Sequence, residues 1–577
     1  MANNAHFISN RSSFASDHAN RSTRVGGTPL IVRFGHIRRI FGLGAVVWLA
    51  AITATHVVAA TDPGADEVAL RVEQSASGEA TISFAAPDVL QRFYQQRGFA
   101  LAWDDQRARA FIEVVRASDT QGLSSADYLV AELTALPPLS SLTGNARIDA
   151  DLELTEALLR YAYHNRFGKV DPRELDPSWN YARNVSAGGP YAALERVIAA
   201  PDLAAQIDVE VSHGPMYEAL RRVLARYRGY AAAGGWQEVA TGPTLKPGSV
   251  DARVGALRKR LAAEEFAATS VSDPNTFDEG LANAVRDFQT HHGIGADGVV
   301  GAKTLVEVNV SANALVDRLR VNLERLRWVL SERTPRFVAV NIAGYQVYYF
   351  DDDKVQWTAR AMVGKPYRAT PIFRADMTYL VINPDWTVPP GILRNDKLPA
   401  IKRDRAYLDK QEMDVVDHSG GVVDPATIDW ASVTPKTFPY MLRQRPGPTN
   451  ALGRIKFIFP NEHFVFLHDT PSRELFTRDE RAFSSGCIRV ENPFELAELI
   501  LRSDPKWTRE SLERAVADEK SVTVSLPQPL PVLILYLTAV AFDGGKEFTF
   551  LRDVYDRDET VLRALNAGFV YSPPVGL

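Results

Sequence analysis

The chain has 577 residues but only one cysteine, Cys487. A single thiol cannot form a disulfide bond within its own chain, which excludes a fold stapled by disulfides. An excess of charge is also absent, because 65 Lys and Arg residues face 70 Asp and Glu residues, a formal net charge of -5. This balance argues against a general binder of nucleic acids or anionic membranes, so we expect partners to be recognised locally.

Long apolar runs are scarce. Residues 40–60 carry no charge, end in the small-residue sequence Val58-Ala59-Ala60, and match the roughly 20 residues that a bilayer-spanning helix needs. Several arginines precede this run and place the N-terminus in the cytoplasm: Arg11, Arg21, Arg24, Arg33, Arg38 and Arg39. We interpret residues 1–60 as a cleaved export signal or an uncleaved anchor in the inner membrane, and expect a periplasmic location for the rest. A buried helix of the fold is the alternative.

Chain length predicts three or four domains. Residues 61–82 are small and polar, and we expect a linker there. Residues 83–244 favour helices, with Leu154 and Leu158 among the apolar residues that recur at helical spacing. No second cluster with metal-ligand spacing accompanies His164, so we expect a helical scaffold domain without a metal site.

Residues 245–312 predict a small helical module. One amphipathic run stops at Gly293, a typical helix C-terminal signal, and a tight Asp297-Gly298 turn follows. The matching pattern comprises Phe288-Gln289, His292-Gly293, Asp297-Gly298, Gly301 and Thr304-Leu305. It resembles the three-helix peptidoglycan-binding module of many cell-wall enzymes. The resemblance implies glycan binding by Phe288, Gln289, Asp297 and Thr304, whereas Phe288 would be a core residue in any such module.

Residues 336–525 alternate apolar and polar positions with many β-branched and aromatic residues, which predicts a β-rich domain. A polar segment at 394–438 interrupts it and is long enough for a small subdomain or lid. Residues 526–577 are expected to pack as an extension on the β-rich domain. Their apolar run 530–542 is too short to span a membrane.

The motif SSGCIRV surrounds Cys487, and His468 ends the strand-like run FVFLHD. A thiol with a pKa near 8.5 is mostly protonated at neutral pH, so a nucleophilic cysteine benefits from a nearby base. Gly486 allows close backbone approach, and the amides of Gly486 and Cys487 can stabilise an oxyanion. Arg489 follows on the same side of an extended chain and can hold a carboxylate. The alternative is a buried, inert cysteine.

The strings HDTP and SSGCIRV resemble the signature of the L,D-transpeptidases, and VGKPYRATPIF and INPDWTVPPGI resemble that family's cleft segments. The domain order resembles the large periplasmic subtype. The resemblance implies Cys487 as nucleophile, His468 as general base, Ser484 and Gly486 as loop-shaping residues, and Arg489 as a residue that orients substrate. Ser485 stands where the family often has His or Asn.

Two further sets of residues follow from the same resemblance. Asp469 would orient His468 through its carboxylate or its backbone carbonyl, or only form a turn. Trp386, Tyr440 and Arg443 would frame the donor and acceptor peptides, or belong to the core or rim of the domain.

The implied reaction cross-links peptidoglycan stem peptides. Cys487 would displace D-alanine from a tetrapeptide donor stem, and an amine of a second stem would resolve the thioester into a three-to-three cross-link. No metal or cofactor is needed, and carbapenem-type β-lactams are expected covalent inhibitors. A carboxypeptidase or hydrolase, transfer to another amine, and a non-catalytic wall-binding scaffold remain alternatives.

Overall fold

The structure is a computed structural model that describes residues 63–77, 84–176, 179–181, 189–211, 213–266, 273–330, 334–352, 354–569 and 571. These residues lie within the compact unit Ala60–Leu577. The predicted signal or anchor at residues 1–60 lies outside them. In the described part of the chain, no helix has the length and apolar character that a membrane crossing requires.

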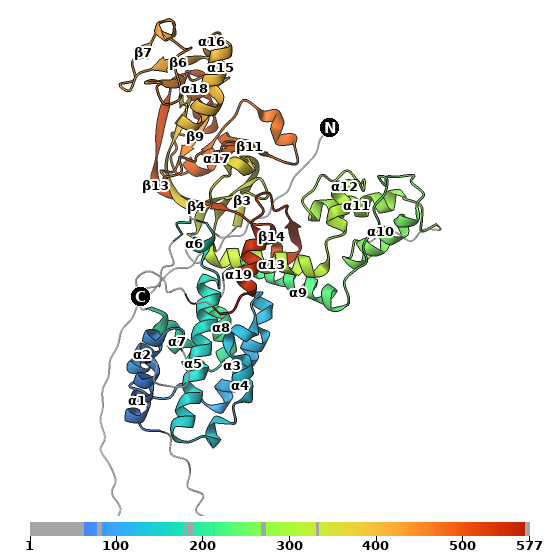
Figure 1. The fold of residues 1–577 in the computed structure, drawn as a ribbon, viewed down its shortest axis with the longest axis vertical. Helices are drawn as coiled ribbons and strands as arrows, with labels where there is room; N and C mark the ends of the chain where they lie inside the picture. The colour runs from blue at the N-terminus through green and yellow to red at the C-terminus, as the bar shows by residue number, and fades with distance from the viewer. Residues whose placement is uncertain are drawn as a thin grey trace, which may run out of the picture. The chain divides into compact units, whose positions relative to one another are not determined.

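The first domain is a bundle of helices around its own apolar core (Figure 1). Its helices are α1 (Ala65–Ala76), α2 (Pro87–Gln96), α3 (Asp105–Arg116), α4 (Val130–Ala135), α5 (Gly144–Phe167), α7 (Gly189–Ala199) and α8 (Leu203–Val211). Leu154 and Leu158 of α5 are buried in this core. The predicted helical scaffold is therefore confirmed.

Helix α1 corrects the prediction of a linker at residues 61–82. Val68 and Val72 are four residues apart, so they lie on one side of the helix, and both are buried in the core of the bundle. Arg71 adds an ion pair with Asp149 of α5, with Nε 2.6 Å from Oδ1. Two well-spaced valines thus dock a segment whose overall composition is small and polar.

Two further helices, α9 (Pro215–Ala232) and α13 (Ala312–Leu330), pack against each other. Tyr217, Leu220 and Tyr227 of α9 are buried in the apolar core that includes the β-rich domain, not in the core of the bundle. The predicted scaffold at 83–244 therefore divides between two cores.

The module that follows α9 has three helices, α10 (Ala252–Ala263), α11 (Glu279–His291) and α12 (Ala302–Val308). It has its own core, in which Leu257, Leu281 and Phe288 are fully buried. The expected three-helix fold is confirmed.

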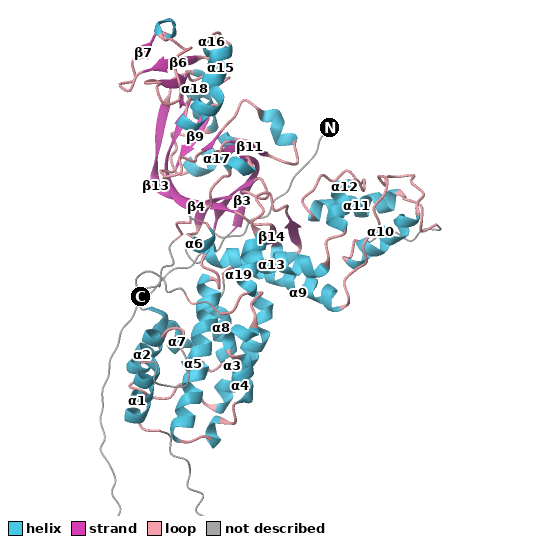
Figure 2. Ribbon diagram, in the orientation of Figure 1, coloured by secondary structure: helices cyan, strands magenta, loops and turns pink. Residues whose placement is uncertain are grey.

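The β-rich domain contains a nine-stranded sheet, where Figure 2 shows the strands concentrated. Its strands are β1 (Arg336–Asn341), β2 (Gln346–Asp351), β3 (Lys354–Gly364), β4 (Phe373–Ile382), β9 (Ile455–Ile458), β10 (Leu467–His468), β11 (Ala482–Ser484), β12 (Ile488–Val490) and β13 (Val522–Leu535). The order is β11-β3-β12-β10-β9-β4-β13-β1-β2, and β2 also pairs with β3. The sheet therefore closes on itself. Helices α17 (Pro493–Leu501) and α18 (Arg509–Ala517) bury Leu496 and Leu512 in the same core.

An inserted subdomain lies between β4 and β9 in the sequence. Its four-stranded sheet has the order β5-β8-β6-β7, formed by β5 (Trp386–Thr387), β6 (Met413–Val416), β7 (Val422–Val423) and β8 (Met441–Gln444). A separate core includes Leu398, Trp430 and Leu442. The insertion is wider than the predicted 394–438 because β5 and β8 flank that range and pair with each other.

The expected boundary between residues 525 and 526 falls inside β13, which pairs with both β1 and β4. After β13 come β14 (Ala539–Phe542), β15 (Glu547–Phe550) and α19 (Asp558–Asn566). β14 packs on α9, and α19 packs on α13. The extension therefore rests on helices as well as on the β-rich domain, where it was expected to pack.

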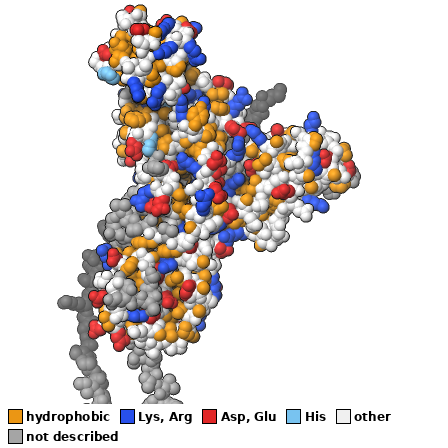
Figure 3. Space-filling view, viewed as in Figure 1, with side chains coloured by type: hydrophobic (Ala, Val, Ile, Leu, Met, Phe, Trp, Pro, Cys, Tyr) orange, Lys and Arg blue, Asp and Glu red, His pale blue; other side chains and the backbone are white. Residues whose placement is uncertain are grey.

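The surface carries both signs of charge. On the face drawn in Figure 3, basic and acidic side chains are interspersed. This mixture agrees with the small net charge of the sequence.

Candidate active site

Cys487 lies between β11 and β12, in a turn that we call the nucleophile loop (Ser484–Cys487). Its side chain is half-buried, and its Sγ lies 3.6 Å from the carbonyl oxygen of Phe464, to which the thiol donates. Phe464 itself is 75% exposed. The thiol is therefore reachable from solvent while its position is held by the neighbouring backbone.

Hydrogen bonds within the nucleophile loop hold its shape. The hydroxyl of Ser484 accepts from the Gly486 amide at 3.1 Å and donates to the Cys487 carbonyl at 2.5 Å. Gly486 has a φ of 121°, which favours glycine. Since Ser484 takes the Gly486 amide, the Cys487 amide is the better candidate of the two predicted oxyanion donors.

Thr370 fixes the nucleophile loop by a hydrogen bond to its backbone. Its Oγ1 donates to the carbonyl of Gly486 at 2.8 Å. The peptide bond that follows Gly486 is planar and trans, so the Cys487 N–H points away from Thr370. Tyr555 of the C-terminal extension supports this contact, because its hydroxyl accepts from the Thr370 amide at 3.2 Å and donates to the Gly364 carbonyl at 2.6 Å.

His468 lies on β10, beside the strand that follows Cys487. It is the register partner of Arg489 on β12 and of Lys456 on β9. Partners on neighbouring strands project on the same face of a sheet, so His468, Arg489 and Lys456 share one face. Cys487 directly precedes β12, and the charges of Lys456 and Arg489 act on both Cys487 and His468.

The imidazole of His468 is oriented by backbone. Its Nδ1 lies 2.5 Å from the carbonyl oxygen of Asp469, which fits an N–H donor at Nδ1. The Asp469 carboxylate has a different partner, because its Oδ2 accepts a hydrogen bond from the Arg454 amide at 2.9 Å. Of the alternatives for Asp469, its backbone carbonyl is the group that contacts His468.

The electrostatic surroundings keep both reactive groups neutral. Burial, followed by the positive charge of Arg489, lowers the pKa of His468 to about 3. Burial raises the pKa of the Cys487 thiol, although the Phe466 backbone, Lys456 and Arg489 oppose that rise. The resting state is therefore a neutral thiol beside a neutral imidazole.

Arg489 brings a positive charge to this face. Burial lowers the pKa of its guanidinium, opposed by Cys487 and Glu474. Its buried Nε has no hydrogen-bond partner among the described residues. An unsatisfied, partly buried guanidinium suits the carboxylate of a ligand.

Trp386, Tyr440 and Arg443 all lie in the inserted subdomain. Trp386 lies on β5 and Arg443 on β8, and the two strands pair. Trp386 and Tyr440 pack against the core of the insertion, and the Lys397 ammonium lies 5.3 Å from the Trp386 ring centroid. In the described part of the chain none of the three predicted residues hydrogen-bonds Cys487.

Three of the four residues predicted to bind glycan are buried: Phe288, Gln289 and Thr304. The Gln289 amide donates to Asp297 Oδ1 at 2.7 Å and to Thr304 Oγ1 at 3.1 Å, and accepts from the Gly298 amide at 2.8 Å. These side chains hold the module together, which corrects the expectation that all four face a ligand. Asp297 is exposed.

Sequence reasoning did not single out Thr370, Arg368, Lys456 or Tyr555. Thr370 and Arg368 lie in the quoted run VGKPYRATPIF, but their partners in the nucleophile loop, Gly486 and Ser485, are more than a hundred residues away. No local signal reveals such contacts. Among the described residues, no group of His, Cys, Asp and Glu side chains could hold a metal ion.

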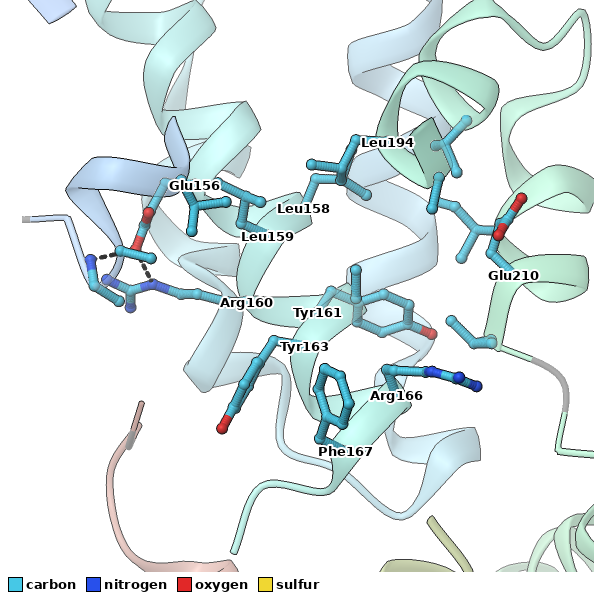
Figure 4. Close-up of a pocket in the computed structure, with 18 of the residues that line it drawn as sticks. Glu156, Leu158, Leu159, Arg160, Tyr161, Tyr163, Arg166, Phe167, Leu194 and Glu210 are labelled. Carbon is cyan, nitrogen blue, oxygen red and sulfur yellow. Dashed lines mark hydrogen bonds and ion pairs between the residues drawn. The ribbon is translucent and has the colours of Figure 1, made fainter. Parts of the chain in front are cut away.

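The scaffold domain contains an apolar cavity of about 300 Å³ that includes none of the active-site residues (Figure 4). It is lined by side chains such as Leu158, Tyr161 and Leu194. At one end Glu156 Oε1 accepts from Arg160 Nε at 2.7 Å and from the Ala85 amide at 2.8 Å.

Comparison with known families gives three matches along the chain. Residues 88–224 match a scaffold domain, residues 250–307 match a family described as "Putative peptidoglycan binding domain", and residues 335–510 match an L,D-transpeptidase catalytic domain. A protein of Haemophilus influenzae named "Putative L,D-transpeptidase" is 36% identical over 247 residues, 43% of this chain and 49% of the relative. The chain thus spans about half the length of this relative.

Solved structures with similarity to the chain include two L,D-transpeptidases. The enzyme of Stackebrandtia nassauensis is 13% identical, with a TM-score of 0.21, over 53% of this chain and 98% of that one. Residues 123–326 of the enzyme of Xylanimonas cellulosilytica are 14% identical, with a TM-score of 0.16, over 52% and 100% of the two chains.

Proposed function

We propose that this protein is a cysteine-dependent L,D-transpeptidase that forms three-to-three cross-links in periplasmic peptidoglycan, because residues 335–510 match an L,D-transpeptidase catalytic domain. The observation that carries the proposal is the pairing of His468 with Arg489 on the strand that directly follows Cys487. It combines a nucleophile, a base and a carboxylate-binding cation. The reaction needs all three.

In the first step Cys487 attacks the amide between the third residue of the donor stem, meso-diaminopimelate, and the fourth, D-alanine. His468 accepts the thiol proton as the carbon–sulfur bond forms, and the Cys487 N–H stabilises the negative oxygen of the tetrahedral intermediate. The carbon–nitrogen bond then breaks, D-alanine leaves with that proton on its amine, and a thioester remains.

The neutral resting pair supports this order of events. His468 is unprotonated at neutral pH because its pKa is about 3, so it is available as a base. Arg489 and Lys456 favour the thiolate that develops during the attack. We therefore assign proton transfer to the attack itself and not to a preformed ion pair.

In the second step an amine of a neighbouring stem attacks the thioester. The new amide bond forms, the carbon–sulfur bond breaks, and the amine's proton returns to the thiol through His468. Arg489 binds a carboxylate of the stem, and the insertion with Trp386, Tyr440 and Arg443 frames the two peptides.

Incubation of purified cell wall with the wild type and with Cys487→Ala tests the proposal. Analysis of the digested muropeptides should show three-to-three dimers only with the wild type. A carbapenem adduct, detected by mass on the wild type and absent from Cys487→Ala, would identify the nucleophile. Cross-links formed equally by Cys487→Ala would exclude the mechanism.

Water or another amine can replace the acceptor without any change at Cys487. Tetrapeptide stems that are only shortened to monomers would identify a carboxypeptidase. A protein that binds sacculi but releases no D-alanine and forms no carbapenem adduct would be a wall-binding scaffold. Glycan binding by residues 245–312 stays a prediction.

A further inference from the structure

Arg368 joins the nucleophile loop to the inserted subdomain. Its Nη1 donates to the hydroxyl of Ser485 at 2.9 Å and forms an ion pair with Oδ2 of Asp396 at 3.0 Å. Ser485 stands two residues before Cys487. Asp396 belongs to the π-helical turn Leu393–Lys397 of the insertion. One guanidinium therefore contacts both the loop of the reactive thiol and a carboxylate of a separately packed subdomain.

Among the described residues, the backbone of Arg368 is held by the β-rich domain. The Arg368 amide donates to the Lys365 carbonyl at 2.8 Å. The turn folds back so closely on β3 that a Cβ at Gly364 would clash with the Arg368 carbonyl oxygen. Two residues later Thr370 bonds Gly486. The backbone of Arg368 is thus fixed beside the nucleophile loop by contacts that do not involve Asp396.

A ligand carboxylate can replace Asp396 in its ion pair with Arg368. The Asp396 side chain is 46% exposed, and ion pairs at such exposure contribute little to stability. Both polar contacts of Arg368 use Nη1, so its other N–H groups have no hydrogen-bond partner among the described residues. A ligand carboxylate can engage an arginine by two parallel hydrogen bonds, which is stronger than this single contact.

Cationic side chains come to this site from separate elements. The charges of Lys456 and Arg489, from β9 and β12, act on the thiol, whereas Arg368, from the turn after β3, contacts Ser485 of the nucleophile loop. Arg489 alone provides one carboxylate-binding group beside the thiol. Arg368 is a further cation at the nucleophile loop, and it therefore favours a substrate with a second carboxylate near the bond that breaks.

We propose that Arg368 binds the carboxylate of the C-terminal D-alanine of the donor peptide, and that Asp396 occupies the guanidinium until the substrate arrives. The inference rests on the proposed function for the identity of the peptide. The terminal carboxylate lies one residue beyond the scissile carbonyl, and Ser485 lies two residues from Cys487, at most about 7 Å between Cα atoms. Binding would exchange one carboxylate for the other and release the insertion from the loop.

Binding is measured in the full chain with Cys487→Ala, which cannot form the thioester. Calorimetry compares a tetrapeptide stem that ends in a free carboxylate with the same peptide ending in an amide. Arg368→Gln should raise the Kd of the acid about tenfold or more and leave the Kd of the amide unchanged. Asp396→Asn should lower the Kd of the acid several-fold, because the competing charge is gone. Arg368→Lys should keep part of the preference for the acid.

The inference is overturned if Arg368→Gln weakens binding of acid and amide equally, or if Asp396→Asn weakens binding of the acid. Either result would indicate that Arg368 has only a structural role. Thermal unfolding of each variant separates this result from loss of the fold. The proposed function fails independently, if the wild type binds the acid through Arg368 but releases no D-alanine. If the wild type cross-links stems but Cys487→Ala binds acid and amide equally, the inference alone is rejected.

Discussion

Thr370 donates a hydrogen bond from its Oγ1 to the carbonyl of Gly486 at a distance of 2.8 Å. Thr370 is fully buried, and its Oγ1 also accepts from the Gly364 amide at 2.9 Å. One hydroxyl therefore connects the end of β3 to the peptide group before the nucleophile. Its position sets the direction of the Cys487 N–H.

Thr370→Val should impair catalysis more than binding. The substitution keeps the shape of the side chain but removes the hydroxyl, so the Cys487 N–H loses its alignment with the oxyanion. We expect kcat for D-alanine release to fall about 10- to 100-fold with little change in KM. Thr370→Ser keeps the hydroxyl and should retain most activity. Unchanged kcat in Thr370→Val would remove the positioning role.

The rate of acylation should not fall as the pH is lowered through 6.5, the ordinary pKa of histidine. His468 has a pKa of about 3 and the thiol pKa is raised, so both groups keep one protonation state between about pH 5 and 8. We expect kcat/KM to be nearly constant there. Stopped-flow measurement of carbapenem acylation across this range checks it. A tenfold fall per unit below pH 6.5 would indicate that the imidazole titrates at its ordinary pKa.

Stability should fall in acid partly because of His468. Its folded pKa of about 3 lies below the ordinary value of 6.5, so the unfolded chain binds more protons between these values. This contribution is complete above pH 6.5 and is lost as pH falls toward 3. Between pH 6.5 and 5 it amounts to about 2 kcal/mol. Urea unfolding of the wild type and of His468→Gln should show this difference, and parallel pH profiles would contradict it.

Gln289→Leu should lower the stability of the three-helix module without a specific effect on wall binding. The buried Gln289 amide forms hydrogen bonds with Asp297, Thr304 and the Gly298 amide. Its loss leaves those groups without this partner and lowers the free energy of unfolding by about 1–3 kcal/mol. Thr290→Ala, at an exposed position on the same helix, is the control. Sacculus pull-down below the unfolding temperature gives the second readout. Lost binding with unchanged stability would restore Gln289 as a contact residue.

The insertion can be removed at a designed junction. Thr387 and Arg443 are antiparallel partners, so an Asn-Gly turn can join them in place of residues 388–442. A deletion of 394–438 would instead leave Val388 and Leu442 without their core. We expect the shortened protein to fold and to react with small thiol reagents, but to turn over stem peptides at least tenfold more slowly. Unchanged turnover would exclude a role for the insertion in catalysis.

Local patterns predicted the parts of the site that are close in sequence. Cys487, Gly486 and Arg489 share one short run, and alternation alone places Cys487 and Arg489 on the same side of the chain. The wider pattern also predicted a helical scaffold, a three-helix module and a β-rich domain. It missed α1, because only Val68 and Val72 mark its buried side in a polar segment.

The sequence by itself determined which residues we propose to carry the chemistry, since thiol, imidazole and guanidinium are properties of the side chains and their spacing sets the local elements. Only the tertiary structure decided what surrounds them. The turn after β3 brings Thr370 and Arg368 to the nucleophile loop, and burial makes Gln289 a structural residue. Strand register also places Arg489 and Lys456 beside His468 and keeps its imidazole neutral. Register and burial depend on contacts between distant segments, and no local period contains that information.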